Sequence, residues 1–276
     1  MNVEKWHGAG NDFVVVDGRD LKSPPEWKSW TRAVCDRRRG IGADGVLVLE
    51  THPSLDFRMH YRNADGGVAD MCGNGGRVLA GFAVMRGLGR DGIVRFESAW
   101  GEHEARVRER EARRRFEVWL TLPDVPAAEE LEIEAPWGRV PALYVSAGVP
   151  HLVVDRARTT AKDLDAVDIL GWGQSLRSHA RLGSAGANVD FLERQDDGSI
   201  AVRTYERGVE GETLACGTGA TASASAAVRW GWGGSPVRVR TRGGDVLAVS
   251  FDASEGALHK VMLAGPAMRM FEASWS

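Results

Sequence analysis

Two cysteines in this chain of 276 residues open the same short phrase, Cys72-Gly-Asn-Gly and Cys216-Gly-Thr-Gly. A tyrosine stands 11 residues before each of them, Tyr61 before the first and Tyr205 before the second. The two segments form an internal repeat whose halves are 144 residues apart. One thiol in each half predicts two matched acid/base groups. Inversion of a stereocentre requires such a pair, because a proton must leave one face of the carbon and another must arrive at the opposite face.

Each cysteine is expected where a helix begins, since apolar and small residues follow its glycines. The first N–H groups of a helix have no partner within the helix, and the dipole there favours negative charge. Such a position lowers a cysteine pKa from about 8.5 towards about 3.5–7.5. The same N–H groups can hold a substrate carboxylate. The alternative is a pair of buried structural cysteines beside glycine turns, but the matched spacing favours the catalytic interpretation.

A charged pair, Glu206 and Arg207, follows Tyr205 directly at the end of a predicted strand, and Arg62 and Asn63 take the parallel place in the first half. A carboxylate beside a guanidinium suits an amino-acid ligand. Glu206 would take the ammonium group, and Arg207 would bind a carboxylate through two parallel hydrogen bonds. The alternative is a surface ion pair of little energetic value.

Three further polar side chains stand at turns. Asn11 lies in a glycine-rich turn between two predicted strands, His151 follows the turn Gly-Val-Pro, and Asn188 begins a strand. Asn11 is predicted to face the active site. His151 could tune the pKa of a thiol, and Asn188 could reach the substrate. Taken singly, each residue also fits an ordinary structural role, namely a hairpin turn, a structural histidine and a turn asparagine.

The segment Gly40-Ile-Gly-Ala-Asp-Gly45 matches the glycine spacing of a dinucleotide-binding loop. That loop needs a strand before it and a helix after it. Here a helix-like stretch, Lys28 to Arg38, comes before the glycines, and a strand-like run, Val46 to Leu49, comes after them. The segment is therefore predicted to be a tight turn near the active site.

The elements that must position these groups are short strands and a few helices. Helices are predicted from Gly76 to Arg86 and from Ala220 to Trp230, directly after the cysteine phrases. Both are apolar or small on every side, which is typical of buried helices. Strands separated by turn residues are predicted at 13–16, 46–49, 57–61, 93–97, 116–121, 140–145, 200–205, 237–241 and 246–251.

The predicted fold class is α+β, with two pseudo-symmetric domains that each curl a mixed or antiparallel sheet around one central helix. The first domain is expected to span residues 1–117 and carry Cys72, and the second to span 118–260 and carry Cys216. Residues 261–276 are expected to return to the first domain, because the N-terminal strand needs a neighbour. The active site is expected in the cleft between the domains.

Composition excludes several classes of protein. Hydrophobic content of 43%, charged content of 26% and a net charge of −3 are typical of globular proteins and argue against nucleic acid as a partner. No apolar run approaches the roughly 20 residues that span a bilayer, so we expect a cytoplasmic protein that binds no membrane. Three cysteines without a Cys-x-x-Cys motif argue against a disulfide framework and a zinc site. Cys35 is expected in the core.

These motifs together resemble the diaminopimelate epimerase family. The matching phrases run in family order from end to end of the chain: 7–13, 39–45, 63–67, 71–77, 150–151, 188, 205–211 and 214–220. The resemblance implies an isomerase that uses neither pyridoxal phosphate nor metal. It implies conversion of LL-diaminopimelate to the meso form on the route to lysine and peptidoglycan. It also implies a homodimer whose partner in the reaction is a small-molecule amino-acid substrate.

The resemblance also implies roles for individual residues. Cys72 and Cys216 would be the two catalytic acid/base residues, and His151 and Glu206 would modulate their pKa values. The residues that would line the substrate site are Asn11, Asn63, Gly73, Asn74, Asn188, Glu206, Arg207, Gly217 and Thr218. Many family members carry Gln at the position of Gly45 and Asn at that of Val149, so this chain would lose two side-chain contacts to the substrate.

Three other functions fit parts of the sequence. A racemase of the same fold could act on another amino acid. A cysteine hydrolase could use Cys216 as nucleophile and His151 as base, but that leaves the first cysteine phrase without a role. A binding protein of the same fold would hold an amino acid without inverting it.

Overall fold

The structure, a computed structural model, describes residues 1–19, 21, 23–69 and 71–275. The chain divides into two compact units, unit 1 with Met1–Thr121 and Gly265–Ser276, and unit 2 with Leu122–Ala264. The boundaries expected from the sequence, after residues 117 and 260, each lie four residues earlier. Among the described residues, no helix has both the length and the apolar character needed to cross a membrane.

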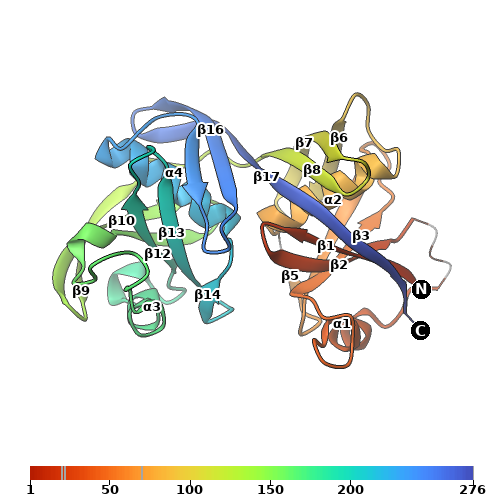
Figure 1. Cartoon of the computed structure of the whole chain (residues 1–276), viewed down its shortest axis with the longest axis horizontal. Helices are drawn as coiled ribbons and strands as arrows, with labels where there is room; N and C mark the ends of the chain where they lie inside the picture. The colour runs from red at the N-terminus through yellow and green to blue at the C-terminus, as the bar shows by residue number, and fades with distance from the viewer. Residues whose placement is uncertain (20, 22, 70, 276) are drawn as a thin grey trace. The chain divides into compact units, whose positions relative to one another are not determined.

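Unit 1 is a mostly antiparallel sheet that curves around one helix, α2 (Figure 1). Its elements are β1 Asn2–Gly8, β2 Asn11–Asp17, α1 Trp27–Cys35, β3 Gly45–Glu50, β4 Phe57–Asn63, β5 Val68–Ala69, α2 Gly73–Met85, β6 Ile93–Ser98, β7 Gly101–Glu111 and β8 Arg115–Thr121. The last strand of the chain, β17 Ala257–Ser274, pairs with both β1 and β8. The C-terminal segment therefore supplies the neighbour that the N-terminal strand needs.

The core of unit 1 lies around α2. Every residue from Gly73 to Ala83 is buried, which agrees with the prediction of a helix enclosed on all sides. Large aromatic side chains pack on one another beside it. Trp6 stacks on Phe116 with ring centroids 5.6 Å apart and meets Phe82 edge-on at 6.1 Å. Such pairs add about 0.5–1.5 kcal/mol each beyond their buried area, so they hold the helix against the strands.

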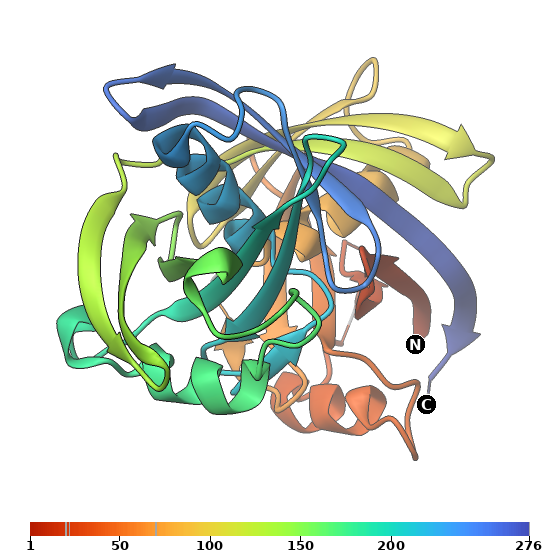
Figure 2. The ribbon, with the colours of Figure 1, turned by 60° about the vertical axis from the view of Figure 1, so that its left-hand side comes forward.

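Unit 2 has its own curved sheet around α4, which Figure 2 shows with strands on several sides of it. Its elements are β9 Glu129–Ala135, β10 Gly138–Ser146, β11 Pro150–Asp155, η1 Arg156–Arg158, α3 Ile169–Arg177, η2 Ala180–Leu182, β12 Asn188–Arg194, β13 Ile200–Glu206, β14 Gly211–Thr213, α4 Gly217–Trp230, β15 Val237–Arg240 and β16 Val246–Ser254. The first part of β17 pairs with β16. Small side chains, mostly Ala and Ser, make up the buried part of α4.

The pairing scheme of unit 1 recurs in unit 2. In unit 1, β1–β2 is antiparallel, β2–β3 parallel, β3–β4 antiparallel and β4–β6 parallel. In unit 2, β10–β11, β11–β12, β12–β13 and β13–β15 follow the same sequence of directions. The repeated tyrosines occupy equivalent places, Tyr61 opposite Leu47 and Tyr205 opposite Val189. The repeat in the sequence is therefore also a repeat of strand topology.

Two details of the predicted helices were wrong. The helices predicted to start at Gly76 and Ala220 start three residues earlier, at Gly73 and Gly217. The glycines of the phrases are thus inside the helices, because each cysteine caps its helix directly. The helix predicted to reach Arg38 ends at Cys35. The Asp36 carboxylate accepts the backbone N–H groups of residues 38 and 39, which turns the chain there.

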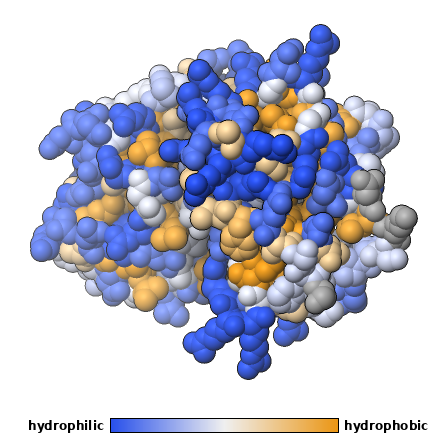
Figure 3. All heavy atoms as spheres, turned by 45° about the vertical axis from the view of Figure 1, so that its right-hand side comes forward, coloured by the Kyte–Doolittle hydropathy of each residue, from blue (hydrophilic) through white to orange (hydrophobic). Residues whose placement is uncertain are grey.

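The surface is largely hydrophilic on the face drawn in Figure 3, with apolar patches between charged side chains. Large hydrophobic side chains that remain exposed include Met270 and Phe271 near the end of β17, at 47% and 48% exposure. Cys35 is buried as expected, at 4% exposure.

Candidate active site

Cys72 is the N-cap of α2, and its sulfur accepts the backbone N–H of Gly75 at 3.5 Å. Cys72 itself has an extended backbone, with φ −132° and ψ 119°, as N-cap residues do. The thiol donates to Asn11 Oδ1 at 3.4 Å. Cys72 is partly exposed, whereas Gly73 and Asn74 behind it are buried. The structure therefore brings Cys72, Gly73, Asn74 and Asn11 together at one helix terminus.

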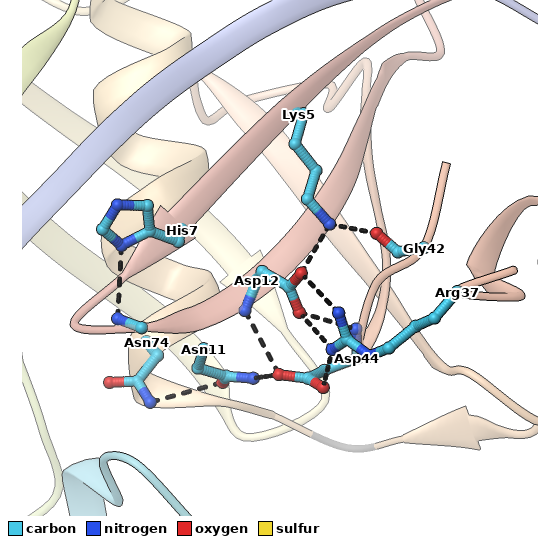
Figure 4. A network of polar contacts seen from close by, with 9 residues as sticks. Lys5, His7, Asn11, Asp12, Arg37, Gly42, Asp44 and Asn74 are labelled. Carbon is cyan, nitrogen blue, oxygen red and sulfur yellow. Dashed lines mark hydrogen bonds and ion pairs between the residues drawn. The ribbon is translucent and has the colours of Figure 1, made fainter. Parts of the chain in front are cut away.

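Two amide groups beside Cys72 have their orientation set by charged neighbours. Asn74 Oδ1 accepts from Arg77 at 2.6 Å, so its Nδ2 faces Asn11 Oδ1 at 3.3 Å. Asn11 Nδ2 donates to Asp44 Oδ2 at 2.6 Å (Figure 4). This hydrogen bond turns the Asn11 oxygen towards the Cys72 thiol. Asp44 was not singled out from the sequence, although it stands in the Gly40–Gly45 turn that was predicted to lie near the site.

A network of four charged side chains, Lys5, Asp12, Arg37 and Asp44, holds this turn in place (Figure 4). Arg37 donates to both oxygens of Asp12, at 3.0 and 2.8 Å, and to Asp44 at 2.7 Å. Lys5 donates to Asp12 at 2.6 Å and to the carbonyl of Gly42. Burial alone would raise the pKa of Asp12, but the hydrogen bonds from Arg37 and Lys5 lower it to about 2.

The second cysteine occupies the equivalent place in unit 2. Cys216 is the N-cap of α4, its sulfur accepts the Gly219 N–H at 3.3 Å, and Thr218 Oγ1 lies 3.3 Å from it. Cys216 is more deeply buried than Cys72. The pKa predicted to be lowered at this helix N-terminus is instead raised for Cys216, because burial raises it well above its ordinary range and the negative charges of Glu206 and Asp190 raise it further. Hydrogen bonds from Thr218 and Gly219 act in the opposite direction.

Asn188, Glu206 and Arg207 lie close to one another in unit 2. Asn188 Oδ1 accepts the backbone N–H of Arg207 at 2.8 Å, and Asn188 Nδ2 lies 3.3 Å from His151 Nε2. The Arg207 guanidinium donates to the carbonyl groups of Ala185 and Gly186, at 3.2 and 3.4 Å. His151 is completely buried and contacts Asp190 at 2.6 Å.

Two positions fall outside these clusters. Asn63 ends β4 opposite Gly45 and is exposed. Gly45 is packed so closely that a Cβ there would lie 2.4 Å from the carbonyl oxygen of Arg62 and 2.7 Å from the ring of Tyr61. A glutamine, the residue of many family members, therefore has no room at position 45 unless the neighbouring strand moves.

Asp190 and Thr204 were missed by the sequence analysis. Asp190 Oδ1 accepts from Thr204 Oγ1 at 2.6 Å, and both side chains are buried. A signal was available, because Asp190 shares a strand face with Asn188 two residues earlier. A carboxylate in the otherwise apolar strand Val-Asp-Phe-Leu must have a buried partner.

The described residues contain no group of three or more His, Cys, Asp and Glu side chains that could hold a metal ion. The arrangement offers two thiols at helix N-termini, carboxylates near one of them, and an arginine beside Glu206. These groups can accept and donate protons and can bind an amino acid through its charges.

Comparison with known proteins gives concordant results. The family model for diaminopimelate epimerase matches residues 3–118 and 143–269. The diaminopimelate epimerase of Aquifex aeolicus is 38% identical over 282 residues, covering 99% of this chain and 96% of the relative. That of Chlorobaculum tepidum is 39% identical over 266 residues, covering 96% and 97%.

Solved structures show the same fold at lower identity. A probable proline racemase from Agrobacterium radiobacter superposes with a TM-score of 0.74 at 20% identity, covering 100% of this chain and 92% of the other. A hydroxyproline epimerase from Agrobacterium vitis gives 0.74 at 17% identity, covering 99% and 91%. The chain thus belongs to the diaminopimelate epimerase family of amino-acid epimerases.

Proposed function

We propose that this protein converts LL-2,6-diaminopimelate to meso-diaminopimelate by a two-base mechanism with Cys72 and Cys216 as the acid/base pair. One observation carries the proposal: each cysteine caps the N-terminus of a buried helix, at equivalent places in a repeated topology. The family membership supports the substrate, and the matched thiols support the chemistry. In this scheme both thiols act on one α-carbon.

The reaction removes the α-proton on one face and delivers a proton on the other. One cysteine acts as thiolate and takes the proton, and the other acts as thiol and gives one, so that the two exchange protonation states in each turnover. Burial and the charges of Glu206 and Asp190 raise the pKa of Cys216 well above its ordinary range, which favours Cys216 as the thiol of the pair. With both thiols acting on one α-carbon, the two titrations would be coupled, because each thiol would respond to the charge of the other.

The α-proton of an amino acid is very weakly acidic, so the intermediate carbanion needs electrostatic stabilisation. The proposed source is the backbone N–H groups of the two helix N-termini, at Gly73 and Asn74 in unit 1 and at Gly217 and Thr218 in unit 2. Preoriented donors of this kind lower a barrier without a cofactor, each typically by about 2.7–4 kcal/mol. Neither pyridoxal phosphate nor a metal ion has a step in this scheme.

The remaining polar residues would select the substrate. Arg207 binds the distal carboxylate with Asn63 and Asn188, and Glu206 takes an ammonium group. Asn11 would hydrogen-bond the substrate near Cys72. His151 acts on the Cys216 side through its contacts with Asp190 and Asn188. We also propose that the protein is cytoplasmic and forms a homodimer. Sedimentation analysis of the purified protein tests the dimer.

A substrate screen tests the proposal. LL-diaminopimelate and a panel that includes proline, hydroxyproline, glutamate and lysine are incubated with the enzyme, and the products are separated by chiral chromatography. Conversion of LL-diaminopimelate to the meso form far faster than any other inversion supports the proposal. Faster inversion of another amino acid would identify a racemase of the same fold instead. Binding without inversion would identify a binding protein, and a trapped acyl-enzyme would identify a hydrolase.

A further inference from the structure

Four buried polar side chains on three neighbouring strands of unit 2 form a continuous chain of hydrogen bonds. Asp190 and His151 have no exposed surface, and Asn188 and Thr204 are 4% and 3% exposed. They adjoin because His151 on β11 lies beside Asn188 on β12, and Asp190 on β12 lies opposite Thr204 on β13. Buried groups of this kind need mutual hydrogen bonds, since an unsatisfied one costs about 1–3 kcal/mol.

The protonation state of these hydrogen-bonded side chains can be deduced from Asn188, which contacts the backbone of Arg207. The backbone N–H of Arg207 can only donate, so the Asn188 atom 2.8 Å from it is the oxygen. The amide nitrogen of Asn188 therefore faces His151 Nε2 at 3.3 Å and donates to it. Because Nε2 accepts, it carries no proton, and the single ring proton sits on Nδ1. That proton is donated to Asp190 Oδ2 at 2.6 Å.

Besides its contact with His151, the carboxylate of Asp190 lies close to two other groups, Thr204 and the first turn of α4. Its Oδ1 accepts from Thr204 Oγ1 at 2.6 Å. The same oxygen lies 2.8 Å from the point where a Cβ of Gly219 would stand, and the Cβ of Cys216 lies 3.2 Å from that point. Asp190 thus touches the first turn of α4, whose N-cap is Cys216. Because the His151 ring is neutral, the buried pair of His151 and Asp190 carries one net negative charge beside the N-terminus of α4.

We propose that Asp190 is a positioning residue of the Cys216 half-site: it holds His151 as the Nδ1–H tautomer, which anchors Asn188 and, through it, the Glu206–Arg207 turn. The expected effect of Asp190 on kcat rests on the proposed function, whereas the expected tautomer of His151 does not. In the opposite tautomer, Nε2–H would face the Asn188 amide nitrogen. Asn188 would then have to rotate and present its nitrogen to the Arg207 N–H, which leaves two donors facing each other.

The groups that face Cys216 come from three elements. Glu206 on β13 and Asp190 on β12 bring negative charge, and the Thr218 hydroxyl and the Gly219 N–H at the start of α4 bring hydrogen bonds. His151 on β11 acts through Asp190, because its hydrogen bond to that carboxylate determines the net charge of the pair. With a neutral ring, that charge favours the protonated thiol, which agrees with the raised pKa of Cys216.

Imidazole nitrogen NMR of the unmodified, ligand-free protein is the first test. At about pH 8, above the ordinary histidine pKa of about 6.5, we expect His151 Nδ1 to be protonated and Nε2 to be unprotonated. His103 is an internal reference, because its Nε2 lies 2.7 Å from Ser98 Oγ in unit 1. A protonated His151 Nε2 would overturn the proposal without any variant having to fold.

Asp190→Asn is the second test, with Thr204→Val as the matched control that removes only the other hydrogen bond of the carboxylate. We expect Asp190→Asn to mix the His151 tautomers, to leave the His103 signals unchanged and to lower kcat for LL-diaminopimelate about 100-fold, as small misplacements do. The KM should change far less than kcat.

Thr204→Val should keep the His151 Nδ1–H tautomer and most of the kcat. Equal losses in the two variants would show that Asp190 is merely structural and would contradict the proposal. If the unmodified enzyme inverts no diaminopimelate, the proposed function fails, while the tautomer measurements still decide the role of Asp190.

Discussion

Two glycines at equivalent places of the repeat, Gly75 and Gly219, should respond in opposite ways to replacement by alanine. Both are the third residue of a helix, and both donate a backbone N–H to the capping cysteine. Alanine is favoured over glycine within a helix by up to about 1 kcal/mol. Without other effects, both replacements would stabilise the protein.

The surroundings of the new methyl group separate the two variants. At position 219 the Cβ would lie 2.8 Å from Asp190 Oδ1 and 3.1 Å from Thr204 Oγ1. That carboxylate is fixed by hydrogen bonds of 2.6 Å to His151 and to Thr204, so it must move away from them. A hydrogen bond to a charged group contributes about 1.5–3 kcal/mol in total, and a displaced carboxylate weakens its two bonds without breaking them. Gly219→Ala should therefore lower the free energy of unfolding by about 1–3 kcal/mol after the helix gain is subtracted.

At position 75 the nearest atoms are the ends of flexible side chains, Leu47 Cδ2 at 3.0 Å and Met59 Cε at 3.4 Å. These can rotate at little cost, so Gly75→Ala should change the free energy of unfolding by less than about 0.5 kcal/mol or increase it. Urea unfolding followed by circular dichroism measures both variants. A loss in Gly75→Ala equal to or larger than that in Gly219→Ala would refute the role assigned to the Asp190 carboxylate.

Two further predictions concern titrating groups. Burial raises the pKa of Cys35 to about 12, so limited alkylation of the native protein, followed by mass spectrometry, should label partly exposed Cys72 and leave Cys35 unmodified; equal labelling rates would contradict the burial. The folded pKa of Asp12, about 2, lies below the unfolded value of about 3.9. Its ion pairs therefore stabilise the fold above about pH 4 and cease to do so as the pH falls towards about 2. In urea unfolding at a series of pH values, the destabilisation caused by Arg37→Ala should shrink over that range, and a constant difference would show that Arg37 acts by packing alone.

The sequence predicted the two helices of the cysteine phrases well, because side chains that are apolar or small on every side leave burial as the stable solution. It placed their starts three residues late, since glycines have a low helix propensity and cysteine is not among the residues that usually cap a helix. Helix α3 and the short strand β14 were not anticipated. Their sequences contain few periodic apolar residues, and packing against β13 holds both elements.

The sequence predicted the local cysteine motifs of the candidate site. It did not predict the carboxylates that lie near them in the folded chain. Cys72 with Asn74 and Cys216 with Thr218 are neighbours in sequence, so a motif could predict that each pair shares one helix terminus. Asp44 is 28 residues from Cys72, and Asp190 is 26 residues from Cys216. Their proximity to the thiols depends on strand register, which single-sequence patterns do not define.

The central claim is that Cys72 and Cys216 act as two bases on opposite faces of one carbon. Epimerisation of LL-diaminopimelate in deuterium oxide, analysed by mass spectrometry during the first few per cent of turnover, tests it most directly. A two-base mechanism predicts deuterium at the α-carbon of the meso product and almost none in the remaining LL-substrate. It also predicts no epimerisation by Cys72→Ala or Cys216→Ala. Deuterium entering substrate and product equally fast, as a single base would produce, or full activity in either variant, would rule out the two-base mechanism.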